Sequence, residues 1–335
     1  MKEELLARLK GNSTLDDLDN LQFVGCGNFA INKIISGDYK KGIPIGGISQ
    51  FKGQSSVGKT LFAVSIARTA INQDFIVKLL DAENAFSKSF AQVIGIDTKK
   101  LLYSCPETVE DSFEDIEQTI RNVRELDKDT PLIIILDSLA CLPIKSELTP
   151  YEERKKGETG YEQNNMEGAI RAKIVGSCLR KINPLLRKNN VALIIINQQR
   201  SKVALYAGGL SDASGGMALE YYLMCDILVR ANKNKDLIKD DEENPLGIEV
   251  ELEVRKNKCA IPFQKTRAKI DFKTGLDQYS GLLDSFIQHK VGIIESGKGR
   301  YQYKDTSFTE KTLPEMIQNK SNKDFDSIRQ LLGVN

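Results

Sequence analysis

The fold is decided by one stretch of the sequence, Gly53-Gln54-Ser55-Ser56-Val57-Gly58-Lys59-Thr60, which fits the pattern G-x-x-x-x-G-K-[ST]. The alternating run 47–52 before it predicts a strand, and the apolar run 61–68 after it predicts a buried helix. This strand–loop–helix order is the context in which the pattern indicates a phosphate-binding loop. The alternative is a chance glycine-rich turn before a core helix.

The chemistry of this loop follows from its residue types. Glycines let successive N–H groups face a phosphate, and the helix N-terminus adds a partial positive charge. Lys59 is expected to reach the β- and γ-phosphates of a nucleotide, and the Thr60 hydroxyl is expected to ligate Mg²⁺. The predicted nucleotide site is the whole loop: Gly53, Gln54, Ser55, Ser56, Val57, Gly58, Lys59 and Thr60.

Composition is ordinary for a globular protein with a proper core. The 335 residues are 41% hydrophobic and 28% charged, which allows one large domain or two of ordinary size. No apolar run approaches the roughly 20 residues that span a bilayer. The first residues, Met1 to Leu6, are acidic where a signal peptide is basic, so we expect a cytoplasmic protein without a membrane partner.

The reactive side chains exclude several kinds of site. A single histidine, His289, excludes His-based metal sites and a histidine-dependent triad. The six cysteines form no C-x-x-C pair and mostly lie in apolar runs, which predicts reduced, buried thiols. A net charge of +1 predicts nothing about nucleic acid, so any DNA binding must come from local basic clusters.

Strands and helices are expected to alternate along most of the chain. This order predicts an α/β fold with a mostly parallel twisted sheet between helices. The expected strands are 75–80, 101–104, 132–136 and 191–196, and the expected helices are 28–36, 86–94, 109–126 and 163–188. More strands are expected at 226–230, 248–254 and 266–272, with a solvated hairpin tip at 239–245.

The two ends of the chain differ from this pattern. Residues 2–10 predict a short amphipathic helix that docks on its own core or on a neighbouring subunit. From residue 281 the pattern changes to helical segments and a hairpin at 292–304, as in a small α+β domain. We therefore expect an N-terminal arm and linker at 1–27, a nucleotide-binding core at 28–280 and a small C-terminal domain at 281–335.

Two carboxylates follow predicted parallel strands. Asp137 ends the aliphatic run 133–136, at the sheet edge where ligands bind, and we expect it to hold Mg²⁺; the alternative is a helix N-cap. Glu83 lies in the segment Asp81–Ala85 after the preceding strand and could activate a water, although a surface loop carboxylate is an equal alternative.

Polar loops follow the last two central strands. Gln198 ends one strand and could report the presence of a γ-phosphate to the glycine-rich loop 201–214. The loop 149–160 is expected at the same edge, and both loops mix basic residues with an aromatic, as single-strand binders do. Each loop by itself is as easily an ordinary surface loop. The charge run 255–258 is either a solvated face or a directed cluster.

Taken together, these residues resemble the RecA family of recombinases, over about residues 28–332. Beside the phosphate loop, the matching pieces are Asp81–Ala85, Leu136–Ser138, Ile196–Arg200, Ser214–Gly216 and Lys256–Lys258 with Ala260–Phe263. The segment Gly275–Asp284 resembles the bacteriophage branch, the UvsX-type strand-exchange proteins. The order and spacing of the pieces carry the resemblance, since no single motif is decisive.

The resemblance implies a role for each matching residue. Glu83 would be the catalytic base, Asp137 the Mg²⁺-associated acid and Gln198 the γ-phosphate sensor. Lys256 and Lys258 would reach the ATP of a neighbouring subunit. Phe90 and Phe272 would flank the adenine. The DNA-binding residues would be Arg154, Lys155, Lys156, Arg171, Arg200, Lys202, Val203, Tyr206, Gly208, Gly209, Gly215 and Gly216.

The departures from the family pattern include Leu61, where many members have a second threonine, and three further positions. Ser87 replaces the acid that contacts the adenine amino group in bacterial members, which leaves base selectivity open. Ser55 replaces a glutamate in the phosphate loop, and Tyr206 lies one position from the usual aromatic, where this chain has Ala207. Insertion of an aromatic between bases is therefore less firmly implied than the position of the loop.

The expected function is an ATP- and Mg²⁺-dependent, DNA-stimulated ATPase that forms helical filaments on single-stranded DNA and pairs it with homologous double-stranded DNA. Partners would include loading or mediator proteins and single-strand-binding proteins, in a bacterial host cell if the chain is phage-encoded. The alternatives are a ring-shaped DNA helicase on the same core, a regulatory scaffold that exchanges no strands, and a P-loop kinase, for which no acceptor pocket or lid is evident.

Overall fold

The computed structural model describes residues 21–148, 160–198, 216–232 and 235–334. The expected helix 2–10 and most of both expected DNA-binding loops lie outside these residues. No helix in the described part of the chain combines the length and the hydropathy that a membrane crossing needs.

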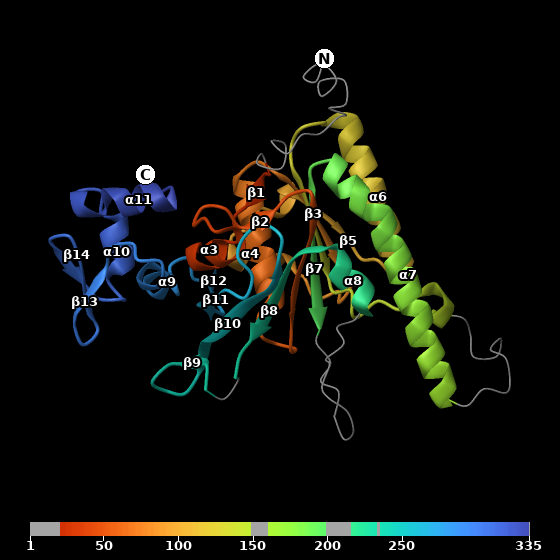
Figure 1. Cartoon of the computed structure of the whole chain (residues 1–335). Coiled ribbons are helices and arrows are strands. Elements are labelled where there is room, and N and C mark those ends of the chain that lie inside the picture. The colour runs from red at the N-terminus through yellow and green to blue at the C-terminus, as the bar shows by residue number, and fades with distance from the viewer. Residues whose placement is uncertain (1–20, 149–159, 199–215, 233–234, 335) are drawn as a thin grey trace, which may run out of the picture.

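A ten-stranded sheet forms the centre of the molecule (Figure 1). The strands from β5 to β8 run parallel, and the strands after β8 are antiparallel. The order is β5 (Leu101–Ser104), β4 (Ile76–Asp81), β6 (Leu132–Asp137), β7 (Val191–Gln198), β3 (Gly47–Gly53), β8 (Leu223–Arg230), β10 (Pro245–Asn257), β11 (Lys265–Asp271) and β12 (Gly275–Leu276), and β9 (Leu237–Lys239) pairs with β10.

Helices cover both faces of the parallel half, and the cover explains its composition. Every residue of β6 is buried, and a strand buried on both faces has to be aliphatic. One face packs against α4 (Lys59–Asn72) and α5 (Lys88–Ile94), and α3 (Phe29–Ser36) continues the cover of this face over the antiparallel strands β10 and β11. The other packs against α6 (Val109–Leu126), α7 (Gly160–Lys188) and α8 (Gly216–Tyr222).

Helix α6 illustrates how the sequence sets these contacts. The Thr108 hydroxyl accepts a hydrogen bond from the N–H of Asp111 and caps the helix. Val109, Phe113 and Ile116 recur at helical spacing on its buried face. The acidic first turn at Glu110 favours this end of the helix, because it offsets the partial positive charge of the N-terminus.

The register of the parallel strands brings their carboxyl ends to one edge. Asp81 at the end of β4 pairs with Asp137 at the end of β6. Gly53 at the end of β3 pairs with Gln198 at the end of β7. Four strands therefore deliver a loop or a polar side chain to the same edge of the sheet, which is where ligands bind in such folds.

The C-terminal residues build a second, smaller core. A three-stranded antiparallel sheet and three short helices form it: β13 (Ile294–Gly297), β14 (Arg300–Tyr303), β15 (Thr306–Phe308), α9 (Leu282–Gln288), α10 (Leu313–Gln318) and α11 (Asp326–Leu332). Phe29 and Tyr39, from α3 and the turn after it, are part of this core. The Asn28 amide donates to the carbonyl oxygens of Asp277 and Ser280, at 2.7 and 2.9 Å, and holds the two cores together.

The remaining elements are short. Within the described ranges they are the antiparallel pair β1 (Phe23–Val24) and β2 (Ile43–Pro44), and 3₁₀ turns at Thr98–Lys100, Lys145–Leu148 and Lys323–Phe325.

The fold class predicted from the sequence is confirmed, and the differences are small. Strand β9 was expected only as part of a hairpin tip, and β12 and β15 were not expected, because strands of two or three residues carry too little pattern. The prediction of buried thiols is wrong for Cys105 and Cys141, which are exposed. Cys105 directly follows β5 and Cys141 lies in the turn after β6, so apolar neighbours in sequence do not cover them. All six cysteines are free.

Candidate functional site

The phosphate loop joins the end of β3 to the start of α4. A Cβ at Gly53 would lie 2.2 Å from the carbonyl oxygen of Val229, so only glycine allows β3 and β8 to end this close together. Gly58 has a φ of 84°, a conformation that side chains disfavour, and a Cβ there would lie 2.4 Å from Ile270. Val57 is fully buried and anchors the loop, whereas Gln54, Ser55 and Ser56 are exposed. The middle of the loop is therefore accessible to a ligand, whereas its two ends are held by packing.

Lys59 and Thr60, the first residues of α4, face the ends of the neighbouring strands. The Thr60 hydroxyl donates to Oδ2 of Asp137 at 2.6 Å. The Lys59 ammonium donates to the carbonyl oxygen of Gln54, across the loop, at 2.5 Å. The structure therefore brings together the lysine, the hydroxyl and the carboxylate that the sequence assigned to phosphate and metal.

The environment of Asp137 suits a cation. Burial raises the pKa of this carboxyl to about 6, against the Thr60 hydrogen bond, which lowers it, and the nearby Glu83 and Asp81 charges raise it further. Its Oδ1 is buried and accepts no hydrogen bond from the described residues. A buried carboxylate oxygen without a donor is costly unless a cation or a proton satisfies it. Thr60 and Asp137 thus fit Mg²⁺, which takes oxygen ligands and needs few from the protein.

Glu83 lies in the turn after β4, and three donors reach its Oε1. They are the Ser138 hydroxyl at 2.9 Å, the Gln198 amide at 3.2 Å and the Cys141 thiol at 3.2 Å. The predicted base and the predicted γ-phosphate sensor are therefore in direct contact. Ser138 and Cys141 come from the turn that begins at Asp137, so this carboxylate is tied to the same turn as the predicted metal ligand.

Asp81 fixes the turn that carries Glu83. Its Oδ2 accepts hydrogen bonds from the N–H of Phe86 at 2.8 Å and from the Tyr103 hydroxyl at 3.0 Å. The N–H of Ala82 donates to the carbonyl oxygen of Asp137 at 2.7 Å. The turn is held at both sides, and this limits where Glu83 can reach.

The predicted adenine contacts lie on different elements. Phe90 is half-buried on α5, 6.0 Å from the Phe86 ring and perpendicular to it. Phe86 also stacks on Tyr103, with centroids 6.3 Å apart. Phe272 directly follows β11, on the antiparallel side of the sheet, and is 47% exposed. Their role at a nucleotide base stays a prediction.

Lys256 and Lys258 lie at the end of β10. The Lys256 ammonium donates to the carbonyl oxygens of Glu220 and Tyr221, at the end of α8. Burial, and then the charge of Lys258, lower the pKa of Lys256. Strand β8 separates β10 from β3, and neither lysine contacts Lys59 or Glu83 in the described part of the chain. Their reach into a neighbouring subunit stays a prediction.

Two of the predicted DNA-binding residues are described. Gly216 is the first residue of α8. Arg171 lies on α7, and its guanidinium donates to the carbonyl oxygens of Leu139 and Leu142 in the turn after β6, at 2.8 Å for Leu139. Arg171 therefore supports the turn that carries Ser138 and Cys141, and its contact with DNA stays a prediction. The others lie outside the described residues: Arg154, Lys155, Lys156, Arg200, Lys202, Val203, Tyr206, Gly208, Gly209 and Gly215.

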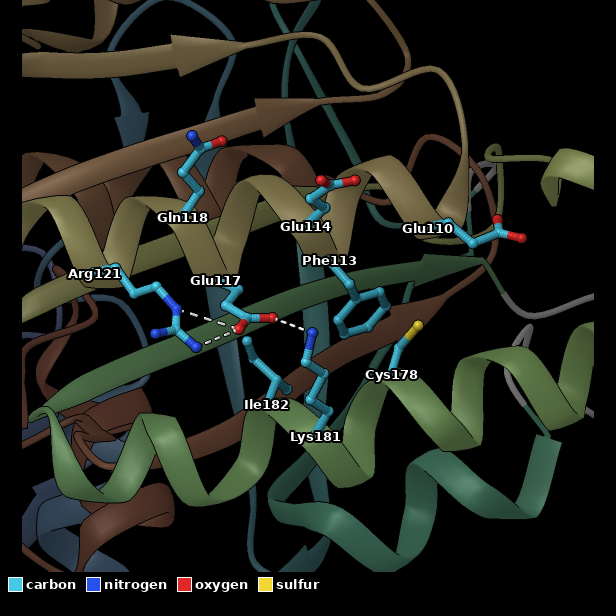
Figure 2. Close-up of a pocket in the computed structure, with 9 residues that line it drawn as sticks. All are labelled: Glu110, Phe113, Glu114, Glu117, Gln118, Arg121, Cys178, Lys181 and Ile182. Atoms are coloured by element: carbon cyan, nitrogen blue, oxygen red, sulfur yellow. Dashed lines mark hydrogen bonds and ion pairs between the residues drawn. The ribbon is translucent and has the colours of Figure 1, made fainter.

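A cavity of about 470 Å³ between α6 and α7 lies apart from the phosphate loop (Figure 2). Glu117 pairs there with Lys181 at 2.5 Å and with Arg121 at 2.7 Å, and these hydrogen bonds lower the pKa of Glu117. Glu110 and Glu114 line the same cavity. Three carboxylates against two cations leave this cavity with a net negative charge, so it does not suit a polyanionic nucleotide.

Sequence reasoning missed Ser138 and Cys141 as neighbours of Glu83. Ser138 stood in a quoted motif but had no role, and Cys141 was expected to be buried. A sequence signal did exist, because both residues follow the carboxyl end of a predicted parallel strand. What could not be inferred is that the turn after β4 meets the turn after β6 at these side chains.

Comparison with known proteins gives a consistent result. Residues 9–277 match the family model described as the RecA N-terminal domain. Protein RecA of Bacteroides thetaiotaomicron is 31% identical over 291 residues, covering 87% of this chain and 80% of the relative. Protein RecA of Thermus aquaticus is 33% identical over 262 residues, covering 78% and 71%. Protein RecA of Ureaplasma parvum serovar 3 is 31% identical over 304 residues, covering 84% of each.

Proposed function

We propose, on the premise that this chain belongs to the RecA family, that it is an ATP-dependent DNA strand-exchange protein. It would polymerise on single-stranded DNA, pair that strand with homologous duplex and hydrolyse ATP between subunits. The loops after β6 and β7 would hold the DNA, mainly by its backbone and by stacking, so that binding tolerates any sequence.

One observation carries the proposal. The phosphate loop, Asp137, Glu83 and Gln198 come from four neighbouring parallel strands and meet at one edge, with Glu83 in contact with Gln198. The strand that ends at Gln198 leads into one predicted DNA-binding loop, and the turn that begins at Asp137 leads toward the other. Strands β6 and β7 would therefore each carry a residue of the nucleotide site and lead toward a loop that contacts DNA.

The residues of the loop would bind the nucleotide first. Lys59 would exchange the carbonyl oxygen of Gln54 for oxygens of the β- and γ-phosphates, and the N–H groups at the start of α4 would face the same anion. Thr60 and Asp137 would hold Mg²⁺, which, when bound, neutralises phosphate charge.

Glu83 would then act as general base. Its carboxylate would accept a proton from the attacking water, the water oxygen would bond to the γ-phosphorus, and the bond from the γ-phosphorus to the bridging oxygen of ADP would break. The products are ADP and inorganic phosphate. Gln198 would leave Glu83 for the γ-phosphate, which alters the start of the following loop.

The finer parts of the proposal rest on the resemblance. Lys256 and Lys258 would stabilise the transferring phosphoryl group of a neighbour's ATP, as arginine fingers do elsewhere. Segment Gly275–Asp284 supports a relationship to the bacteriophage UvsX-type proteins. The protein would then act in the cytoplasm of a bacterial cell, with loading and single-strand-binding proteins as partners.

Joint-molecule formation tests the proposal. Circular single-stranded DNA and homologous linear duplex are incubated with the protein, Mg²⁺ and ATP, and the products are separated on an agarose gel. We expect joint molecules that require ATP and homology, and Lys59→Ala is expected to abolish them. ATP hydrolysis without any joint molecules, with closed rings in negative-stain images, would instead favour a ring motor.

A further inference from the structure

The thiol of Cys141 lies at a chemically unusual place for a cysteine, against the carboxylate of Glu83. Its Sγ is 3.2 Å from Oε1 of Glu83 and 3.1 Å from the Ser138 hydroxyl oxygen. The hydroxyl is itself 2.9 Å from the same Oε1. The three side chains therefore form a closed triangle in which the carboxylate is the only group that cannot donate.

Counting protons shows what the thiol adds. Ser138 and Cys141 carry one donor hydrogen each, and the triangle has three contacts, so two are hydrogen bonds at a time. Both groups donate to Oε1, or the thiol donates to the hydroxyl, which donates to Oε1, or the hydroxyl donates to the thiol, which donates to Oε1. In all three arrangements the thiol proton supports the placement of Glu83. Burial and the Glu83 charge raise the pKa of Cys141, so the proton is present at neutral pH.

The third donor to Glu83, the Gln198 amide, would not hold this carboxylate during the reaction. Gln198 donates to Oε1 at 3.2 Å, but in the proposed mechanism its amide turns to the γ-phosphate. Glu83 is exposed, so without other contacts its side chain would sample several rotamers. Among the residues that the structure describes, only the two donors on the turn after Asp137 then remain to hold it, and this turn also carries the predicted metal ligand.

We infer that Cys141 is a positioning residue, whose thiol, together with the Ser138 hydroxyl, holds Oε1 of Glu83 so that Oε2 is the oxygen that meets the attacking water. The inference rests on the proposed ATPase function and on Glu83 as its base. Among the described residues, Oε2 accepts no hydrogen bond, whereas Oε1 receives three contacts. This asymmetry leaves one oxygen without a competing donor.

The experiment is steady-state ATP hydrolysis on saturating single-stranded DNA, with Cys141→Ala, Cys141→Ser and the matched control Cys178→Ala. Cys178 is a half-buried cysteine on α7, at the cavity between α6 and α7. We expect Cys141→Ala to lower kcat about two- to tenfold, the effect of one modest hydrogen bond, with KM for ATP unchanged. Cys141→Ser keeps a donor and is expected to restore kcat to within about twofold of the wild type. Cys178→Ala is expected to match the wild type.

Two further measurements exclude a merely structural effect. Thermal unfolding and nucleotide-dependent DNA binding of Cys141→Ala are expected to match the wild type. In a Glu83→Gln background, Cys141→Ala is expected to change the residual turnover less than it does in the wild type, because residues that act through one another are not additive.

Failure of the inference differs from failure of the proposed function. A wild-type protein without DNA-stimulated hydrolysis would overturn the proposed function. An active wild type that Glu83→Gln inactivates, together with a Cys141→Ala variant of equal kcat, would overturn only the role of Cys141. Equal losses in the alanine and serine variants would also overturn it, because a donor in the same place would then be irrelevant.

Discussion

The parallel and antiparallel halves of the ten-stranded sheet place their polar side chains differently. In the parallel half, β6 has no exposed residue, and its polar group is the aspartate at its end. In the antiparallel half, β11 alternates buried and exposed positions, and its solvent face carries charges. Helices cover both faces of the first half, whereas the second keeps one face in water. Strand β6 therefore carries its polar side chain at the strand end, whereas β11 carries charged side chains along its length.

The antiparallel half handles its charges as ion pairs between neighbouring strands. Glu253 on β10 lies 2.9 Å from Arg230 on β8 and 3.9 Å from Lys265 on β11. Arg255 also reaches it, at 3.0 Å. Pairs of this kind, with at least one exposed partner, contribute little stability each. The comparison shows that a carboxylate at the end of a parallel strand and one in the middle of an antiparallel strand have different neighbours: Asp137 accepts a hydrogen bond from Thr60 beside the phosphate loop, whereas Glu253 lies among three cations.

The largest expected effect separates these two kinds of carboxylate by activity. Glu83→Gln is expected to lower DNA-stimulated ATP turnover by about 10²–10⁴-fold, because it removes the proposed general base. Nucleotide-dependent DNA binding should persist. The matched control is Glu251→Gln on β10, where turnover should stay at the wild-type level. Steady-state phosphate release measures both, and equal rates for wild type and Glu83→Gln would remove this residue from the mechanism.

The next effect concerns stability and tests whether helices bury both faces of the parallel half of the sheet. Ile134→Ala, at a fully buried position of β6, is expected to lower the free energy of unfolding by about 2–5 kcal/mol, because it leaves a cavity. The same substitution at Ile261, which is 71% exposed in the turn between β10 and β11, is expected to cost less than about 0.5 kcal/mol. Urea unfolding followed by circular dichroism measures both, and a similar loss at the two sites would contradict the division of the sheet.

The raised pKa of Asp137 predicts that the free energy of unfolding depends on pH. The measurement is made without nucleotide and with a chelator, so that no cation occupies the site. The folded-state pKa of Asp137, about 6, lies above the ordinary value of 3.8, so the folded state keeps a proton that the unfolded state releases. Stability from this group is therefore present below about pH 4 and is lost as the pH rises through 6. The loss is about 3 kcal/mol at most.

Asp137→Asn is expected to flatten that part of the pH profile. The control is Asp305→Asn, at an exposed residue between β14 and β15, which should leave the slope unchanged. Urea unfolding at half-unit steps from pH 4 to pH 7 measures the difference. A profile that Asp137→Asn leaves as steep as before would show that another group produces it.

The smallest effect belongs to the ion pairs of the antiparallel half. A double-mutant cycle of Arg230→Ala and Glu253→Gln is expected to give a coupling energy below about 1 kcal/mol, because Arg230 is 45% exposed and two other cations remain near Glu253. The coupling should shrink further in 1 M NaCl. A coupling of several kcal/mol would show that this pair is effectively desolvated and that the two halves differ less than the structure indicates.

The sequence predicted most strongly what is local. The phosphate loop is recognisable because its glycines meet needs of the backbone, and the parallel strands are recognisable because burial on both faces leaves continuous aliphatic runs. Asp137 could be assigned to the ligand edge because it ends one of these aliphatic runs. Strands β12 and β15 could not be recognised, since two or three residues carry no periodicity.

Contacts between turns could not be predicted, because they depend on how loops meet in space. The sequence proposes Glu83 as a base but does not reveal that Ser138, Cys141 and Gln198 reach one oxygen of it. Cys141 was misjudged from its apolar neighbours, Ala140 and Leu142, of which Leu142 is buried. Arg171 was assigned to DNA by the family resemblance, and its hydrogen bonds to carbonyl oxygens of the turn after β6 were not foreseen.

The C-terminal core is completed by Phe29 and Tyr39, far away along the chain. This sharing has an evolutionary consequence. A gene that acquired its 3′ end from a distant relative would inherit only part of a hydrophobic interior, with two aromatic rings from the 5′ end selected against other neighbours. Substitutions at the beginning and the end of the gene are therefore expected to co-vary, and recombination breakpoints that separate the two should be rare.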